Sequence, residues 1–157
     1  MKKIILGPPL TGKSTLAQEL RIRVQTPVLD FDEELLKLND NKWPGDDSEL
    51  NDRLRKEVEQ DILGRDDIIF MAFEFSLEGL RIARDNGFTI YQLTAERGVL
   101  EERNRKRLVT DPTNDAFDYV DTNLAYQKSV KEAGLVDLEL DATAPAEDLV
   151  KQVLTEA

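Results

Sequence analysis

The segment Gly7-Pro8-Pro9-Leu10-Thr11-Gly12-Lys13-Ser14-Thr15 fits the pattern G-x-x-x-x-G-K-[ST] without a mismatch. In this pattern, backbone N–H groups surround a phosphate at the positive end of the following helix. Its lysine reaches the terminal phosphates of a nucleotide and its serine binds Mg²⁺. A short apolar run at 3–6 precedes the segment, and apolar residues at helical spacing follow it over 14–23. We therefore expect a site for ATP and Mg²⁺ rather than a chance Gly-Pro turn.

We call this segment the phosphate loop. The residue types within it indicate the role of each position. Glycine tolerates backbone conformations and close approaches that a β-carbon would obstruct, and the two prolines have no N–H to donate. The N–H donors must then come mainly from residues 10–15. We expect Lys13 at the β- and γ-phosphates, Ser14 at Mg²⁺ and Thr15 at the α-phosphate. The residues expected to bind the nucleotide are Gly7, Leu10, Thr11, Gly12, Lys13, Ser14 and Thr15.

Carboxylates follow two of the expected strands. Asp30 and Asp32 end the strand expected at 26–30, and residues two apart on an extended chain point the same way. Asp32 is the first candidate to orient an acceptor hydroxyl and take its proton, and Asp30 is a candidate Mg²⁺ ligand. Either could instead cap the helix that follows. Glu74, after the apolar strand expected at 68–73, could hold a Mg²⁺-bound water or be an exposed strand-end residue, so the base is Asp30, Asp32 or Glu74.

Two pairs of arginines are candidate phosphate or acceptor ligands. Arg103 and Arg107 are four apart on an expected helix and share one face. Beside a polar loop they resemble a lid that brings positive charge to the γ-phosphate, with Arg103 also contacting the nucleotide. The alternative is a solvated face paired with Glu101 and Glu102. Arg53 and Arg55 could clamp an anionic acceptor or simply face solvent.

Strand-like and helix-like segments alternate along the whole chain, which is typical of one domain with a parallel sheet covered by helices on both faces. The expected strands are 3–6, 26–30, 68–73, 88–94 and 135–140, and the expected helices are 14–23, 31–38, 49–63, 77–86, 97–108, 119–133 and 146–154. In such sheets the site lies beyond the carboxyl ends of the strands. We expect a short lid at about 108–119 and acceptor-binding helices at about 31–63.

Composition narrows the chemistry. The 157 residues include no cysteine and no histidine, so a general base must be a carboxylate and a metal is expected to be Mg²⁺ on oxygen ligands. The net charge of −11 disfavours a nucleic-acid partner. Apolar runs are too short to span a bilayer and no signal peptide is evident. We expect a cytoplasmic monomer or homodimer with no membrane partner.

Taken together, these motifs resemble the small P-loop kinases, the group of shikimate kinase, nucleoside monophosphate kinases and phage polynucleotide kinase. Asp30-Phe31-Asp32 is similar to the Asp-x-Asp of shikimate kinase, and 103–107 resembles the lid-entry element of the group. The resemblance implies a P-loop NTPase three-layer sandwich with a five-stranded parallel sheet. It also implies Asp32 as base and Arg107 as a phosphate-stabilising lid arginine. The Asp-Gly-Phe-Pro-Arg of nucleoside monophosphate kinases is replaced by 71–75, which lacks the acceptor arginine.

The function that these features favour is Mg²⁺-dependent transfer of the γ-phosphoryl group of ATP to a hydroxyl, or a phosphate, of a small metabolite or nucleotide. The similarity of residues 1–15 and 100–108 to phage polynucleotide kinase leaves a nucleic-acid kinase as an alternative. That enzyme would act on a 5′-hydroxyl or a hydroxymethylated base. A nucleotide-binding switch is a third possibility, although the sequence has no Asn-Lys-x-Asp guanine-reading motif.

Overall fold

The computed structural model describes residues 1–155 and forms a five-stranded parallel sheet in the order β2-β3-β1-β4-β5. The strands are β1 (Lys2–Leu6), β2 (Val28–Asp30), β3 (Ile68–Ala72), β4 (Thr89–Thr94) and β5 (Leu138–Asp141). β1 lies in the middle, with Ile4 opposite Phe70 of β3 and Ile5 opposite Tyr91 of β4. The apolar sequence of β3 is fully buried, as expected for a strand covered on both faces.

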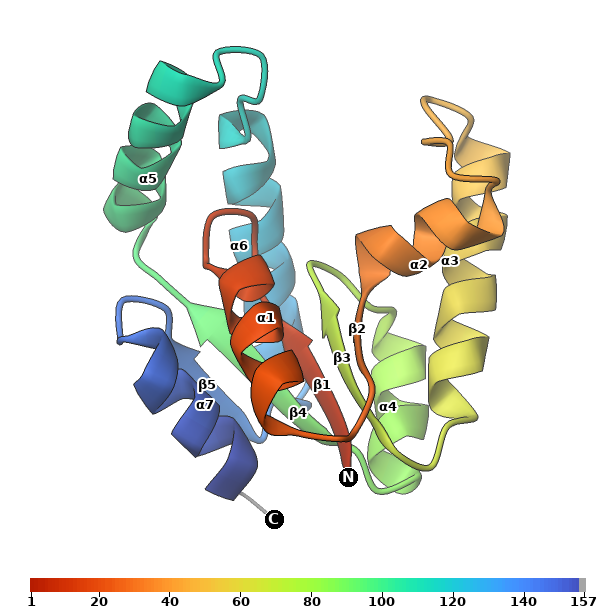
Figure 1. Cartoon of the computed structure of the whole chain (residues 1–157). Coiled ribbons are helices and arrows are strands. Elements are labelled where there is room, and N and C mark those ends of the chain that lie inside the picture. Colours follow the sequence, from red (N-terminus) through yellow and green to blue (C-terminus); the bar gives the residue numbers. More distant parts are fainter. Residues whose placement is uncertain (156–157) are drawn as a thin grey trace.

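Helices cover both faces of this sheet, so the architecture is the expected α/β three-layer sandwich (Figure 1). The helices are α1 (Lys13–Arg23), α2 (Phe31–Leu38), α3 (Ser48–Leu63), α4 (Leu77–Asp85), α5 (Arg97–Thr110), α6 (Phe117–Glu132) and α7 (Ala146–Thr155). Successive strand residues point to opposite faces. Ile4 therefore packs in the core with α3 and α4, whereas Ile5 packs in the second core with α1 and α7.

The carboxyl ends of the strands lie between two groups of helices. In Figure 1, α5 and the upper part of α6 stand on one side of these ends, and α2 and α3 stand on the other. The loops that follow β1, β2 and β3 emerge between the two groups. This is the edge of the sheet at which the sequence predicts the site.

Most element bounds lie within one residue of the expected ones, and those of β2, α5, α6 and β5 differ by two or three. Helix α5 continues to Thr110 and α6 begins at Phe117, so only 111–116 connect them, a shorter segment than the lid expected at 108–119. Buried Asn104 anchors this connection by donating to Asp115 Oδ1 (2.8 Å) and accepting from the N–H of Ala116 (3.1 Å). Strand β5 begins at Leu138 rather than at residue 135. No helix within residues 1–155 is long and apolar enough to cross a membrane.

We expect two isoleucines that differ in burial to contribute very differently to the stability of the protein. Ile62 on α3 is fully buried, whereas Ile22 on α1 is 78% exposed. We expect Ile62→Ala to lower the free energy of unfolding by about 2–5 kcal/mol because it removes buried methyl groups and leaves a cavity. The same change at Ile22 should alter it by no more than about 0.5 kcal/mol. Urea unfolding of both variants measures the difference, and equal losses would contradict the packing described here.

Candidate active site

The phosphate loop connects β1 to α1 and is held in shape by its own side chains. Gly12 has a φ of 85° and caps α1, a left-handed conformation that favours glycine. Gly7 is required for a different reason, because a β-carbon there would lie 2.8 Å from Thr11 Oγ1. The Thr11 hydroxyl is buried and donates to the carbonyl of Pro8 (2.7 Å). Leu10 adopts a φ of 72°, which is a strained conformation for a residue with a side chain.

Lys13 lies across this loop. Its Nζ donates to the carbonyls of Gly7 (2.6 Å) and Pro8 (3.0 Å). Burial lowers the pKa of Lys13 to about 8, even though the nearby carboxylates of Asp30 and Asp32 act in the opposite direction. Additional negative charge beside the Lys13 ammonium group would raise its pKa again and keep it fully protonated.

Asp30 and Asp32 have different surroundings. Asp30 is the N-cap of α2, and its Oδ1 accepts from the N–H groups of Asp32 (2.9 Å) and Glu33 (3.4 Å). Within residues 1–155 no hydrogen bond is formed by the Asp32 side chain. Burial, and then the charge of Asp30, raises the pKa of Asp32, while Lys13 acts to lower it. Of the two alternatives weighed for this pair, capping therefore applies to Asp30 and leaves the carboxylate of Asp32 available.

A cavity of about 340 Å³ brings the candidate groups for phosphoryl transfer together. We call it the transfer cavity; it is lined by Pro9, Leu10, Gly12, Lys13, Ser14, Asp30, Phe31, Asp32, Ala72, Phe73 and Arg107. These residues come from the loops and elements that follow β1, β2 and β3, together with α5. Lys13, Ser14, Asp32 and Arg107, which the sequence suggested for phosphoryl transfer, thus line one cavity.

The oxygen ligands at this cavity fit Mg²⁺. Mg²⁺ is usually held by one or two protein oxygens plus substrate phosphates and waters, not by a full cage of side chains. The Ser14 hydroxyl and the carboxylates of Asp30 and Asp32 line the cavity together. Residues 1–155 contain no group of three acidic, histidine or cysteine side chains arranged to hold a metal. The donor set therefore suits a Mg²⁺ ion that arrives with phosphates.

Arg103 and Arg107 lie on the same helix but line different cavities. Arg103 donates to the carbonyls of Leu10 (2.8 Å) and Ala142 (2.8 Å). Its cavity, about 400 Å³, is lined also by Leu10, Thr11, Gly12, Thr15, Leu16, Ala142, Ala144, Ala146 and Leu149. The pairing with Glu101 and Glu102 that was the alternative for these arginines is made by Arg97 and Arg105 instead.

A third cavity of about 290 Å³ lies between α2, α3 and the loop that joins them. This acceptor cavity, as we call it, is lined by Phe31, Asp32, Leu35, Trp43, Pro44, Gly45, Asp46, Asn51, Arg55 and Phe73. Phe31, Asp32 and Phe73 also line the transfer cavity, so the two spaces adjoin. Sequence reasoning missed Trp43, Asp46 and Asn51. Trp43 is the only tryptophan and is 61% exposed in a Trp-Pro-Gly turn, which was the one available signal.

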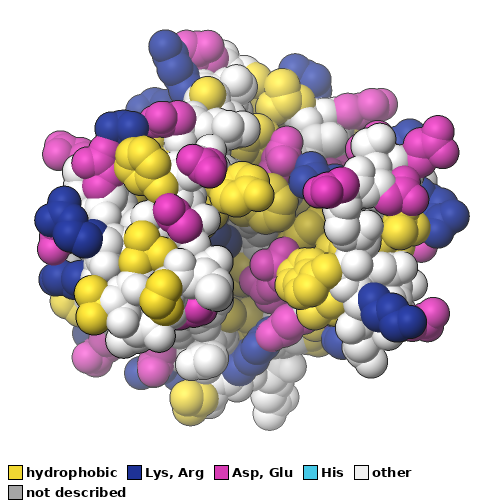
Figure 2. All heavy atoms as spheres, turned by 90° about the horizontal axis from the view of Figure 1, so that it is seen from above, with side chains coloured by type: hydrophobic (Ala, Val, Ile, Leu, Met, Phe, Trp, Pro, Cys, Tyr) yellow, Lys and Arg dark blue, Asp and Glu magenta, His cyan; other side chains and the backbone are white. Residues whose placement is uncertain are grey.

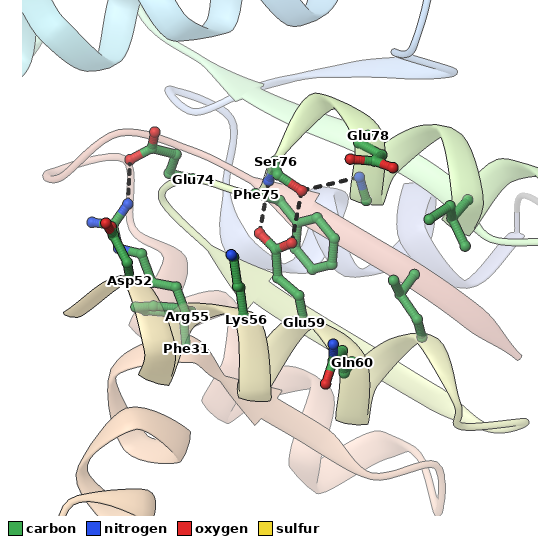
Figure 3. A pocket seen from close by; sticks show the side chains of 13 residues that line it. Phe31, Asp52, Arg55, Lys56, Glu59, Gln60, Glu74, Phe75, Ser76 and Glu78 are labelled. Carbon is green, nitrogen blue, oxygen red and sulfur yellow. Dashed lines mark hydrogen bonds and ion pairs between the residues drawn. The ribbon is translucent and has the colours of Figure 1, made fainter. Parts of the chain in front are cut away.

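The structure places Arg55 and Glu74 against each other. Arg55 forms an ion pair with Glu74 (3.0 Å) and lies over the ring of Phe73, 5.4 Å from its centroid. Figure 3 shows this pair at one end of a larger cavity, about 580 Å³, between α3 and α4. Arg53 is exposed and lines none of the cavities described here, so it does not join Arg55 in a clamp.

Hydrogen bonds at the far end of the large cavity connect α3 to the start of α4. Glu59 on α3 accepts from both the N–H and the hydroxyl of Ser76 (2.7 Å each), and Ser76 in turn caps α4 through the N–H of Gly79 (Figure 3). These contacts fix α4 against α3. Seen from the carboxyl ends of the strands, the molecule is hollowed, and the hollow is surrounded mainly by acidic and hydrophobic side chains (Figure 2).

Solved structures with the same fold include two small-molecule kinases and the YorR protein. A shikimate kinase from Aquifex aeolicus has a TM-score of 0.75 at 20% identity, covering 99% of this chain and 95% of that one. A gluconokinase from Sinorhizobium meliloti has a TM-score of 0.67 at 14% identity, covering 98% and 89%. The YorR protein of Bacillus subtilis, solved with phosphorylated GDP, has a TM-score of 0.65 at 16% identity, covering 99% and 94%.

No protein-family model and no curated protein sequence matches this chain. The structural likeness confirms the fold that the motifs predicted, that of the small P-loop kinases. At these identities the likeness establishes the fold alone, and the roles of individual residues rest on their geometry.

The environment of Lys13 predicts that MgATP binding draws in a proton. Bound phosphates should raise the pKa of Lys13 from about 8 back toward its ordinary value. At pH 8 we expect uptake of about half a proton per nucleotide, falling to about a tenth at pH 7, where Lys13 is already mostly charged. Calorimetric titrations in buffers of different ionisation enthalpy measure this uptake. Equal uptake at both pH values, or none at pH 8, would show that Lys13 does not meet the phosphates.

Proposed function

We propose that this protein is a kinase that transfers the γ-phosphoryl group of ATP, with Mg²⁺, to a hydroxyl of a small molecule. The observation that carries the proposal is the transfer cavity, where Lys13, Ser14, Asp32 and Arg107 meet. A cation, a hydroxyl ligand for Mg²⁺, a carboxylate without a hydrogen-bond partner among the described residues and a lid-side arginine are the parts that phosphoryl transfer requires. An adjoining cavity with room for a second substrate supports the same conclusion.

The nucleotide would span two of the cavities. N–H groups of the phosphate loop, at the start of α1, would bind its β-phosphate, and Thr15 its α-phosphate. The cavity beside Arg103 is lined largely by alanine and leucine side chains, which suits a flat nucleobase. Arg103 would act mainly by holding the loop, since its guanidinium donates to the Leu10 and Ala142 carbonyls. Mg²⁺, held by Ser14 and Asp30, would offset the charge on the phosphates.

In the transfer step the acceptor oxygen forms a bond to the γ-phosphorus. The bond from that phosphorus to the β–γ bridging oxygen breaks, and ADP leaves with the electron pair. The proton of the acceptor hydroxyl passes to the carboxylate of Asp32. A raised pKa makes Asp32 a stronger base than an ordinary aspartate. Lys13 and Arg107 stabilise the negative charge that is spread over the transferring group.

A nucleic-acid acceptor is the less favoured candidate. Acidic and hydrophobic side chains predominate around the hollow at the carboxyl ends of the strands (Figure 2), and the net charge is −11. Phosphate backbones are bound by clusters of lysine and arginine, and their binding weakens steeply with salt. Activity that changes little with salt would accordingly agree with a small acceptor, and a steep loss with salt would favour the nucleic acid.

An acceptor screen with γ-labelled ATP tests the proposal directly. Sugars, hydroxy acids, amino alcohols, nucleosides, nucleotides and hydroxymethylated DNA would serve as acceptors, and Lys13→Ala and Asp32→Asn as controls. We expect transfer to at least one class, abolished by Lys13→Ala. Asp32→Asn should lose transfer by about 10²-fold or more while still binding MgATP, because it removes the base and not the phosphate contacts. Slow hydrolysis without any acceptor dependence would instead favour a nucleotide-binding switch.

Arg107 and Arg105 form a matched pair for testing the lid. Arg107 lines the transfer cavity, whereas Arg105 pairs with Glu102 on the outer side of α5. We expect Arg107→Ala to lower kcat by about 10²-fold or more with a smaller change in ATP affinity, since its charge is needed most in the transition state. Arg105→Ala should leave both within about twofold. A loss confined to ATP affinity in Arg107→Ala would make it a binding residue only.

A further inference from the structure

We infer that the acceptor is an alcohol that carries a protonated amine, and that Glu74 sets this preference by engaging Arg55. The inference rests on the proposed kinase function and names the substrate class for the same site. Its starting point is the acceptor cavity, which shares Asp32 with the transfer cavity. A molecule in the acceptor cavity therefore presents its hydroxyl at the boundary where the γ-phosphoryl group would arrive.

The charges that line the acceptor cavity oppose an anionic acceptor. Arg55 is the only lysine or arginine among the lining residues, and its guanidinium is paired with Glu74 at 3.0 Å. Asp32 and Asp46 line the same cavity. The cavity lining and the ion-pair partner Glu74 thus carry three carboxylates and one guanidinium. The ion pair alone is partly exposed, with side chains 40% and 43% accessible, and would be a weak barrier. The excess of carboxylates is what repels a second anion.

Cations of the neighbouring transfer cavity do not reverse this balance. Lys13 and Arg107 line that cavity, where the phosphates of ATP would bind. Once MgATP is bound, the two positive charges of Lys13 and Arg107 are offset by its net negative charge. This side then adds no net positive charge, so the charges that line the acceptor cavity decide which acceptor is favoured.

Hydrogen-bonding capacity points to the same class. The Nδ2 of Asn51 already donates to the carbonyls of Gly45 (3.0 Å) and Asp47 (2.8 Å), so its remaining capacity is the acceptor oxygen. Together with the carboxylates of Asp32 and Asp46, this gives the lining more acceptor side chains than donors, which are the indole N–H of Trp43 and the guanidinium of Arg55, paired with Glu74. The complement of such a surface is a group that only donates, and an ammonium offers three N–H donors and no acceptor.

Aromatic side chains in the acceptor cavity also favour a cationic acceptor. Phe31, Trp43 and Phe73 line the cavity; Arg55 already lies over the rings of Phe31 and Phe73, whereas Trp43 remains 61% exposed. The face of an indole attracts a cation more strongly than other aromatic rings do. A neutral sugar or nucleoside could stack on the same rings, but it would leave the excess carboxylates without a counter-charge. An aminated alcohol satisfies the rings and the carboxylates together.

The fluorescence of Trp43 can be used to measure acceptor binding. Because it is the only tryptophan and lines the cavity, its fluorescence reports acceptor binding without requiring turnover. Two matched sets of probes carry an amine, no charge or a carboxylate on one skeleton. The first is glucosamine, glucose and glucuronate, and the second is phenylalaninol, 3-phenylpropanol and phenyllactate. With a non-hydrolysable MgATP analogue bound, we expect the amine to bind at least about tenfold more tightly than the carboxylate in a set that binds, with the neutral member between.

The role of Glu74 is tested by two variants that remove the same charge. Glu74→Gln frees Arg55, whereas Glu57→Gln removes an exposed carboxylate of α3 that lines none of the cavities described above. We expect Glu74→Gln to shift the ratio of amine to carboxylate affinities by about tenfold toward the carboxylate. Glu57→Gln should shift it by less than about twofold. A purely structural role for Glu74 would weaken all three probes of a set equally.

Several outcomes would overturn the inference. These are a carboxylate or neutral probe that binds most tightly, amine probes that do not bind although the MgATP analogue does, or an unchanged affinity ratio in Glu74→Gln. In each of these cases the proposed kinase function would stand. Absence of Mg²⁺-dependent binding of the nucleotide analogue would instead remove the proposed function, and with it the inference.

Discussion

The site depends on the parallel arrangement of all five strands. Because every strand runs in the same direction, every carboxyl end lies at one edge of the sheet, and each following loop begins there. The phosphate loop follows β1, Asp30 ends β2 and Glu74 lies shortly after β3. Charged groups that are far apart in the sequence are thereby gathered in one place. The buried apolar residues of β1 and β3 serve this arrangement by keeping the strand ends rigidly in register.

Gathering these charges costs folding free energy. Burial lowers the pKa of Lys13 and raises those of Asp30 and Asp32, so at neutral pH each charged form is less favoured in the folded protein than in the unfolded chain. For the two aspartates this cost appears as pH rises through their ordinary pKa and persists above it. For Lys13 it disappears as pH rises from about 8 toward its ordinary value. Phosphates and Mg²⁺ bound between them would relieve all three, which links nucleotide binding to stability.

The order of the elements could be predicted from the sequence, and the phosphate loop could be recognised in it. The phosphate loop is recognisable because its function depends on residue types at fixed spacing along the chain. The acceptor side depends instead on which side chains the fold brings together. Arg55 and Glu74 were both candidates, but nothing in the sequence indicates that they pair with each other. Arg103 and Arg107, although one helical turn apart, line different cavities, which their spacing along the chain does not indicate.

The two arginines of α5 connect this helix to the phosphate loop and to the transfer cavity. Arg103 is tied to the carbonyl of Leu10, a residue held in a strained conformation within the phosphate loop. Arg107 extends from the same helix into the transfer cavity. A rotation of α5 that withdrew Arg107 would therefore also act on the hydrogen bond between Arg103 and Leu10. Under the proposed function, release of ADP would be coupled to a change in the phosphate loop.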